Sequence, residues 1–366
     1  MNLTSNSLET VQPITEVSFI TRLLSALRPD MVAAEGVTSS HQDASPERFR
    51  AVTEIPNDPK LPALVALRDI CLKDAPQADD PGGMTLELLL CGYSEGTRAT
   101  FEARAGNRRV AVKAYAEDAA PEAELYEALA AAGLGGDSGA RVPPLLFWER
   151  QLRVLVIGWL EGPTAHDLIK DGRGARAGEL AAHWIRRAAS LTMKVGPPLG
   201  AAQLVDRVRA GAAAFGAVDP AMGTAALAVA DVLVRTQPKE RDPHLVHATL
   251  YARHVLDLGD GPGVIDWQRF GHGPVELDAG MFLATIARVG LDHAKRAGEA
   301  ARAEEAFLAG TRGLLDERSL GWHRAAALFQ LAARRVGHPE RHNPGRWGER
   351  IQALLDEAAR HAGATG

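Results

Sequence analysis

One stretch constrains the fold and the chemistry of this chain more than any other: HLVHATLYARHVLDLGDGPGVIDWQRFG, residues 244–271. Its two short apolar runs, HVLDL and PGVIDW, flank a GDGPG turn, and this pattern predicts a β-hairpin. Asp266 follows Val264 and Ile265 directly, so the second strand delivers a carboxylate. A buried charge needs a partner, and carboxylate oxygen is the ligand that a hard cation such as Mg²⁺ prefers. The hairpin therefore predicts a metal site at Asp266.

The sequence on either side of the hairpin predicts an α+β chain. Residues 1–85 show helical spacing in three stretches that polar spacers separate. Residues 86–162 alternate apolar and polar positions around Gly-containing turns, which predicts five strands and one helix. Residues 163–366 are mostly helical and rich in alanine, apart from the hairpin. We therefore expect an N-terminal helical extension, a small β-rich lobe and a large helical lobe. The three helical stretches of the extension are 17–32, 44–55 and 61–75.

Composition excludes several classes of function. The 366 residues carry a net charge of -5, and their arginines are interleaved with acids, so we expect no nucleic-acid partner. The chain has no apolar run long enough to span a membrane and no signal-peptide pattern. Its two cysteines, Cys71 and Cys91, are too few for a disulfide framework or a thiolate metal site. A cytoplasmic protein without a membrane partner is the expectation.

The β-rich segment contains features that suit a nucleotide. A turn between two predicted strands holds the small residues Ser94, Gly96 and Thr97. Small residues let backbone N–H groups approach phosphate oxygens, although strand turns commonly use Gly and Ser for other reasons. Lys113 follows in the strand VAVKAY, where alternation turns it towards one face of the sheet. We expect that face to meet a ligand.

An acid at the start of the next helix completes this group. Glu122 and Glu124 both lie there, and either is able to pair with Lys113 and hold it against the phosphates. For both acids the alternative is a favourable interaction with the helix dipole. Together with Asp266, these residues stand in the order that phosphoryl transfer from Mg-ATP requires.

From about residue 86 to 300 the sequence resembles the aminoglycoside phosphotransferase (choline kinase-like) branch of the protein-kinase fold. The resemblance rests on VAVKAYAEDAAPEAELYEALAAAGL, on VLVIGWLEGPTAHDLI and on GVIDWQRFGHGPVELDAGMFLA, where Asp278 occupies the place of a structural aspartate. It implies a bilobal protein-kinase-like fold with ATP and Mg²⁺ as cofactors.

The resemblance also implies roles for individual residues. Lys113 and Glu122 are expected to form the phosphate-orienting pair, with Glu122 preferred because it matches the family's helix position. Asp266 is expected to bind the metal. Adenine is expected to lie against backbone groups between Ile157 and Leu160.

The catalytic loop departs from the family. Where the family usually has His-Gly-Asp-Leu-His-x-x-Asn, this chain reads HATLYARH, residues 247–254. Thr249 therefore replaces the proton-accepting aspartate, and His254 replaces the metal-binding amide. Threonine does not accept a proton at neutral pH, and neutral imidazole is a poor ligand for Mg²⁺. A general base contributes about 10²–10⁴-fold to a rate, so transfer is weakened rather than excluded.

The replacement base is open at this point. His247, His254, the substrate or a partner would each serve. The alternatives are structural: a backbone contact near Asp266 for His247, a local hydrogen bond for Thr249 and a surface or inter-lobe position for His254. Three further histidines, of which the last two have zinc-like spacing, are expected to lie in a surface loop because no cysteine pair accompanies them. They are His323, His338 and His342.

Two functions follow from these residues. The first is an ATP-dependent phosphotransferase acting on a hydroxyl of a small polar molecule or of Ser/Thr in a peptide, the latter with a partner lyase. The second is a pseudokinase that binds nucleotide or a partner without transfer, because the usual catalytic acid and amide are both absent. In either case the N-terminal extension is expected either to cap the small lobe or to contact a protein partner.

Overall fold

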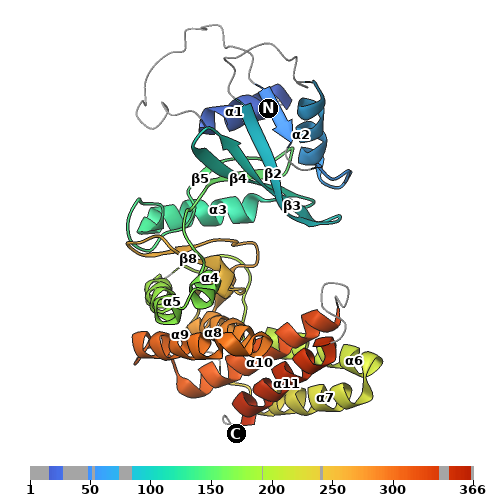
Figure 1. The fold of residues 1–366 in the computed structure, drawn as a ribbon, viewed down its shortest axis with the longest axis vertical. Helices are drawn as coiled ribbons and strands as arrows, with labels where there is room; N and C mark the ends of the chain where they lie inside the picture. Colours follow the sequence, from blue (N-terminus) through green and yellow to red (C-terminus); the bar gives the residue numbers. More distant parts are fainter. Residues whose placement is uncertain are drawn as a thin grey trace, which may run out of the picture. The chain divides into compact units, whose positions relative to one another are not determined.

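The computed structural model describes residues 16–27, 48–51, 54–73, 85–191, 193–239, 242–337 and 346–363. The chain divides into two compact units. The first comprises residues 1–127 and 144–159, and the second comprises 128–143 and 160–366. The strands of the large sheet belong to the first unit, and most helices belong to the second (Figure 1). The predicted α+β class is confirmed.

The first unit is built on a six-stranded sheet in the order β1-β2-β3-β4-β6-β5. The five strands from β2 to β6 pair in antiparallel fashion, as the alternation of apolar residues predicted. Gly106 lies in the tight turn between β3 and β4 and adopts φ +57°. A residue with a Cβ would be strained in this conformation. The strands are β1 Arg48–Ala51, β2 Thr85–Ser94, β3 Arg98–Ala105, β4 Arg108–Tyr115, β5 Leu145–Glu149 and β6 Val154–Gly158.

The helix predicted over 44–55 is wrong. Residues of this stretch form β1, which pairs in parallel with β2 from Arg48 opposite Thr85 to Ala51 opposite Leu88. The edge of β2 offers backbone donors and acceptors that a new strand satisfies at once, whereas a short helix leaves its terminal groups unpaired. A long-range pairing of this kind has no signature in the local spacing of apolar residues.

Three helices accompany the sheet: α1 Glu16–Leu27, α2 Pro62–Lys73 and α3 Ala120–Leu129. The predicted face of α1 is buried, since Phe19 and Leu23 lie in one apolar core with Phe101 and Val112 of the sheet. Phe19 also meets Phe147 edge-on, with ring centroids 6.1 Å apart. Each such side chain contributes about 1.5–3 kcal/mol on burial, so α1 and α2 form part of the core of this unit.

The second unit is mainly helical. One of its cores lies among α6, α7, α8, α10 and α11 and contains Phe215, Trp322 and Phe329. Phe215 and Phe329 pack edge-on at 5.4 Å. Helices α10 and α11 lie side by side, as Figure 1 shows. The helices are α4 Ala165–Lys170, α5 Gly174–Ala189, α6 Ala201–Val218, α7 Pro220–Arg235, α8 Val275–Asp292, α9 Ala297–Gly310, α10 Glu317–Val336 and α11 Trp347–Gly363.

The hairpin predicted from the sequence is present in this unit. Strands β8 Val255–Asp257 and β9 Pro262–Val264 pair in antiparallel fashion. A second pair, β7 His244–Val246 with β10 Gly271–Gly273, closes the same stretch at its ends. In the described part of the chain, none of the helices has both the length and the apolar character that a membrane span requires.

Candidate active site

Lys113 and Glu122 form a buried ion pair in the first unit. Lys113 Nζ lies 2.5 Å from Glu122 Oε1, and both side chains are less than one-tenth exposed. Strand β4 supplies the lysine and the first turn of α3 supplies the acid. Glu124, the rival acid, is exposed. Removal of one member would leave a buried charge without its partner, which costs about 3–5 kcal/mol.

Tyr115 is a third member of this group that the sequence did not single out for a role. Its hydroxyl donates to Glu122 Oε2 at 2.6 Å, so the two carboxylate oxygens hold Lys113 and Tyr115 respectively. Lys113 and Tyr115 are two positions apart on β4 and therefore point to the same face of the sheet. This alternation was the available signal. The acid is thereby fixed in orientation, and so is the ammonium group that it binds.

The turn that contains Ser94, Gly96 and Thr97 joins β2 to β3. Thr97 N–H donates to Ser94 O at 3.0 Å, and Gly96 adopts φ +63°. The N–H of Gly96 donates to Asp58 Oδ2 at 2.6 Å, and the Tyr93 hydroxyl donates to the same oxygen at 3.1 Å. The Gly96 N–H holds the pKa of Asp58 below its ordinary value. A carboxylate thus already binds one of the turn amides that phosphate was expected to meet.

The two residues expected beside adenine occupy different environments. Ile157 lies in β6, is buried, and stands opposite Ala111 of β4. Leu160 is half-buried in the second unit, where its side chain covers Gly263 of β9. Their role in adenine binding stays a prediction.

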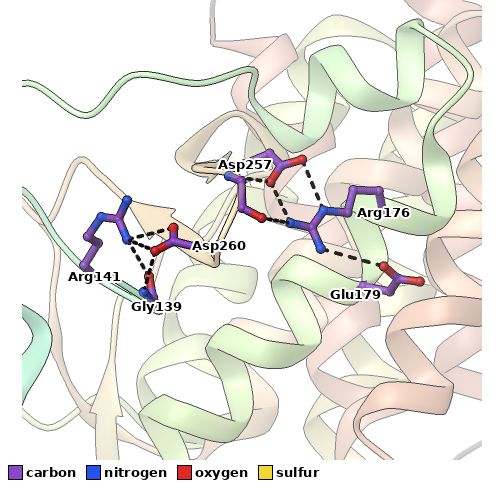
Figure 2. A network of polar contacts seen from close by, with 7 residues as sticks. Gly139, Arg141, Arg176, Glu179, Asp257 and Asp260 are labelled. Carbon is purple, nitrogen blue, oxygen red and sulfur yellow. Dashed lines mark hydrogen bonds and ion pairs between the residues drawn. The ribbon is translucent and has the colours of Figure 1, made fainter. Parts of the chain in front are cut away.

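Two arginines form ion pairs with aspartates of the hairpin in the second unit (Figure 2). Arg176 of α5 binds Asp257 through two nitrogens, at 2.7 and 3.1 Å. Arg141 binds Asp260 at 2.9 Å, and Gly139 N–H donates to the same carboxylate at 3.0 Å. These donors hold the pKa of both aspartates below the ordinary value. The ends of β8 and of its turn are therefore fixed, and β9 leads from them to Asp266.

The backbone of the loop 247–254 is held by hydrogen bonds to a different residue, Asp278. Asp278, in the first turn of α8, accepts the N–H of His247 at 2.6 Å and the N–H of Ala248 at 2.8 Å. Burial raises the pKa of Asp278 to about 7, against the lowering effect of these two donors. Ala248 adopts φ +62°, a conformation that is strained for a residue with a Cβ. That angle suits a glycine, the residue that the resemblance led us to expect at this position.

His247 and Thr249 are brought together. His247 is fully buried, and its Nε2–H donates to Ile265 O at 2.9 Å, so Nδ1 is the accepting nitrogen, and it accepts the backbone N–H of Thr249 at 3.4 Å. Thr249 Oγ1 lies 3.3 Å from that Nδ1. The threonine hydroxyl therefore donates to the imidazole, and the ring is held by the backbone carbonyl that precedes Asp266. The expected structural contact of His247 near Asp266 is present.

His254 faces Asp266 across 3.4 Å, measured from Nε2 to Oδ2. Its Nδ1 lies 2.8 Å from Thr249 O and must donate there, because a carbonyl only accepts. Burial and the nearby His247 lower the pKa of His254 to about 3, so the ring is neutral. Asp266 adopts φ +69°, and such strain is concentrated at functional sites. His254 is thus a buried neighbour of the expected metal ligand, not a surface histidine.

Among the described residues, no group of three or more His, Cys, Asp or Glu side chains is arranged to hold a metal ion. The surface loop expected around His323 is wrong, because His323 is buried in α10, where its Nδ1 donates to Ser319 O at 2.8 Å. The other two histidines singled out by their spacing, His338 and His342, lie outside the described residues.

Solved structures with the same succession of sheet and helices are kinases and phosphotransferases, which places this chain in the class of protein-kinase-like folds. One is a choline/ethanolamine kinase family protein from Mesorhizobium loti, 18% identical, covering 79% of this chain and 94% of that one, with a TM-score of 0.51. Another is a thermostable mutant of the aminoglycoside phosphotransferase APH(4)-Ia in a ternary complex with AMP-PNP and hygromycin B. It is 16% identical, covers 74% of this chain and 93% of that one, and has a TM-score of 0.52.

The family is shown by sequence. The chain belongs to the APH phosphotransferase enzyme family, whose profile matches residues 93–328. A structure described as glucosamine kinase is also similar in fold, at 19% identity over 74% of this chain and 80% of that one, with a TM-score of 0.50. A comparison with curated protein sequences found no significant match.

Proposed function

We propose that this protein is an ATP-dependent phosphotransferase that transfers the γ-phosphoryl group to a hydroxyl of a small molecule. The observation that carries the proposal is the buried pair of Lys113 and Glu122, further bound by Tyr115. An apolar side chain at this position would stabilise the protein about as well as a buried, paired lysine does. The ammonium group is nevertheless present and held in a fixed orientation, which points to an anionic ligand. Phosphate oxygens of ATP fit it, and membership of the family supports this assignment.

The residues of the second unit suit a divalent cation. Asp266 Oδ2 and His254 Nε2 are 3.4 Å apart, and two ligands of one cation at about 2.1 Å each are separated by roughly 3.0–3.4 Å. A cation bound there would neutralise charge on the transferring phosphoryl group. The oxygen of Asp266 suits Mg²⁺, and the imidazole nitrogen favours an ion such as Mn²⁺.

The acceptor hydroxyl loses its proton during transfer, and the geometry provides a route. As the acceptor oxygen bonds to phosphorus and the bond to the ADP oxygen breaks, Thr249 Oγ1 would take the proton while passing its own to His247 Nδ1, which also accepts the Thr249 backbone N–H at 3.4 Å. The chain therefore retains a proton acceptor behind the threonine. Since His247 is buried and the bond is long, we expect a slower step than a carboxylate would give.

Of the two classes of acceptor, a small molecule and Ser/Thr of a peptide, we favour the small molecule. The support is family membership, together with a small pocket beside Ala248 in the second unit. The partner-lyase alternative has no residue in its support. The apolar side of α1 packs in the core of the first unit, so a partner of the N-terminal segment would have to use its other side.

A pseudokinase is the second candidate, and two observations favour it. The hydroxyl of Thr249 stands where a carboxylate is usual, and the Gly96 amide is already bound to Asp58. In this alternative Lys113, Glu122 and Asp266 would bind nucleotide without turnover.

The decisive experiment measures nucleotide binding and ADP formation on the same preparations. Calorimetry with AMP-PNP and Mn²⁺ or Mg²⁺ should show binding to the wild type that Lys113→Met weakens by at least ~10²-fold, because one buried charge partner of the phosphates is removed. Lys170→Met, a change at an exposed lysine, is the matched control. ADP formation in the presence of an acceptor should be abolished by Asp266→Asn but not by Asp206→Asn at an exposed aspartate.

The two candidates give different results. Nucleotide binding with ADP formation that depends on an added hydroxyl compound supports the phosphotransferase. Binding that never leads to ADP across a broad acceptor panel supports the pseudokinase. Equal nucleotide affinity in the wild type and Lys113→Met would overturn both.

A further inference from the structure

A segment of the N-terminal extension, residues 54–61, contacts the turn between β2 and β3. Asp58 Oδ2 accepts the N–H of Gly96 at 2.6 Å and the hydroxyl of Tyr93 at 3.1 Å. The side chain of Lys60 lies along the same turn, because a Cβ added at Gly96 would stand 3.3 Å from its Cδ and 3.4 Å from its Nζ. Asp58 and Lys60 both precede the range that matches the family profile, so family membership does not account for the contact.

The local structure of the segment uses only one oxygen of the Asp58 carboxylate. Oδ1 accepts the N–H of Lys60 at 3.0 Å, and the carbonyl of Asp58 accepts the N–H of Leu61 at 3.1 Å, which forms a turn directly before α2. Aspartate is common in such turns because one side-chain oxygen bonds the backbone two residues on. The other oxygen of Asp58 bonds Gly96, 38 positions away, and the side chain is buried there. Asp58 therefore joins the segment to the β2–β3 turn.

The segment holds this turn from the side of the sheet opposite to Lys113. Leu61 packs, together with α2, in the apolar core that contains Val112 of β4. Lys113 follows Val112 in the strand, so it points to the other face, where it binds Glu122. A nucleotide bound to Lys113 would meet the turn from that second face. The position of Asp58 therefore suits a support behind the turn and not a competitor of the phosphates.

The turn is also bonded to the strand that carries Lys113. The N–H of Ala116, directly after β4, donates to Thr97 O at 2.9 Å. Thr100, three positions further along β3, stands opposite Lys113. A displacement of the turn would thus alter the backbone beside Tyr115 and Lys113, the two residues of β4 that bind the same carboxylate.

We propose that Asp58 is a positioning residue of the nucleotide site: it holds the β2–β3 turn in the conformation that binds nucleotide, so that nucleotide affinity depends on segment 54–61. Asp58 acts through the N–H of Gly96 and touches no phosphate itself. The proposal rests on the proposed function for the presence of ATP. By thermodynamic linkage, bound nucleotide strengthens the bond between Asp58 and Gly96 by the same factor by which that bond strengthens nucleotide binding.

Calorimetry with AMP-PNP and Mn²⁺ on the full chain tests one side of this linkage. Asp58→Ala should weaken binding about tenfold, because the turn loses a hydrogen bond to a charged group. Asp58→Asn keeps a side-chain oxygen for the Gly96 N–H and should bind within about threefold of the wild type. Glu54→Ala, at an exposed acid of the same segment, is the matched control and should bind like the wild type.

Hydrogen exchange of the Gly96 amide in the wild type tests the other side and needs no variant. Saturating AMP-PNP should slow this exchange about tenfold, while the amide of Gly106, in the turn between β3 and β4, should change little. Where ADP formation is measurable, Asp58→Ala should raise the KM for ATP about tenfold and leave kcat nearly unchanged. A merely structural role would lower kcat through loss of folded protein and would leave the exchange rate of the wild type indifferent to nucleotide.

The results separate this inference from the proposed reaction. Faster exchange of the Gly96 amide in the presence of AMP-PNP would show that phosphate displaces Asp58, and it overturns the inference. An unchanged exchange rate, or an Asp58→Ala variant that binds like the wild type, overturns it as well, and in all three cases the phosphotransferase stands. Slower exchange and weakened binding in a protein that forms no ADP with any acceptor support the role of Asp58 while the proposed transfer fails. A wild type that binds no nucleotide overturns both.

Discussion

His254 Nε2 and Asp266 Oδ2 face each other at 3.4 Å, while the other ring nitrogen of His254 is turned to Thr249 O. The imidazole is neutral and its single hydrogen is on Nδ1, where it is donated to Thr249 O. Two groups that only accept are thus held together by the fold. Such an arrangement is unfavourable unless a proton or a metal ion lies between the two atoms, so the pair would influence the choice of ion if the proposed cation binds here.

The first prediction concerns that cation. Because imidazole nitrogen favours Mn²⁺ over Mg²⁺, we expect Mn²⁺ to bind in the presence of AMP-PNP about tenfold more tightly than Mg²⁺. Titration followed by the electron paramagnetic resonance of Mn²⁺, with Mg²⁺ as competitor, measures the ratio directly. His254→Asn should reduce the preference, and His183→Asn, at an exposed histidine, should not. A ratio that His254→Asn leaves unchanged would show that the imidazole does not bind the ion.

The second prediction concerns pH. The pKa of His254 is about 3 in the folded protein and about 6.5 when unfolded, so the unfolded chain takes up a proton first as pH falls. The contribution of His254 to stability is therefore present above about pH 6.5 and is lost progressively towards pH 3. Between pH 6.5 and 5 the wild type should lose about 2 kcal/mol more than His254→Asn. Urea unfolding at several pH values tests this, and parallel curves for the two proteins would contradict it.

The third prediction concerns Tyr115. Tyr115→Phe removes the hydroxyl that donates to Glu122 Oε2 and should lower the free energy of unfolding by about 1–3 kcal/mol. Because Lys113 keeps its own bond to Glu122, nucleotide affinity should fall far less than in Lys113→Met. Tyr93→Phe is the matched control, since it removes a hydroxyl bonded to Asp58 and leaves Glu122 untouched. A loss of affinity as large as that of Lys113→Met would mean that Tyr115 itself contacts the nucleotide.

The fourth prediction concerns the turn at Gly96. Asp58→Ala removes the acceptor of the Gly96 N–H, and the amide should exchange its hydrogen with solvent at least about tenfold faster. Glu95→Ala, at an exposed residue of the same turn, should leave this rate nearly unchanged. Hydrogen exchange followed by NMR measures both. An unaltered rate in Asp58→Ala would show that other contacts fix the turn.

The sequence predicted features that depend on neighbours in the chain. Strand alternation placed Lys113 on a face, the helix start supplied Glu122, and the run before Asp266 identified the hairpin. Each of these follows from a local period of two residues or from a helix terminus. The short distance between Lys113 and Glu122 spans nine residues, which a strand and the following helix readily bring together.

Contacts between distant residues were not predictable in the same way. Arg176 lies 81 positions from Asp257, and Arg141 lies 119 from Asp260, so no spacing relates them. The bond from Gly96 to Asp58 spans 38 residues. The burial of His254 was missed for a related reason, since a polar residue in a loop gives no sign that helices will cover it. Only the folded chain decides these contacts.

The hairpin and the catalytic loop are held in place by two separate sets of hydrogen bonds and ion pairs. Arg141 and Arg176 fix the segment that leads to Asp266, whereas Asp278 fixes the backbone at His247 and Ala248. A substitution at Thr249 disturbs neither set of bonds. The fold therefore holds Asp266 in place independently of the side chain at position 249, so a substitution of Thr249 would change the chemistry of the loop while the backbone on both sides stays where it is.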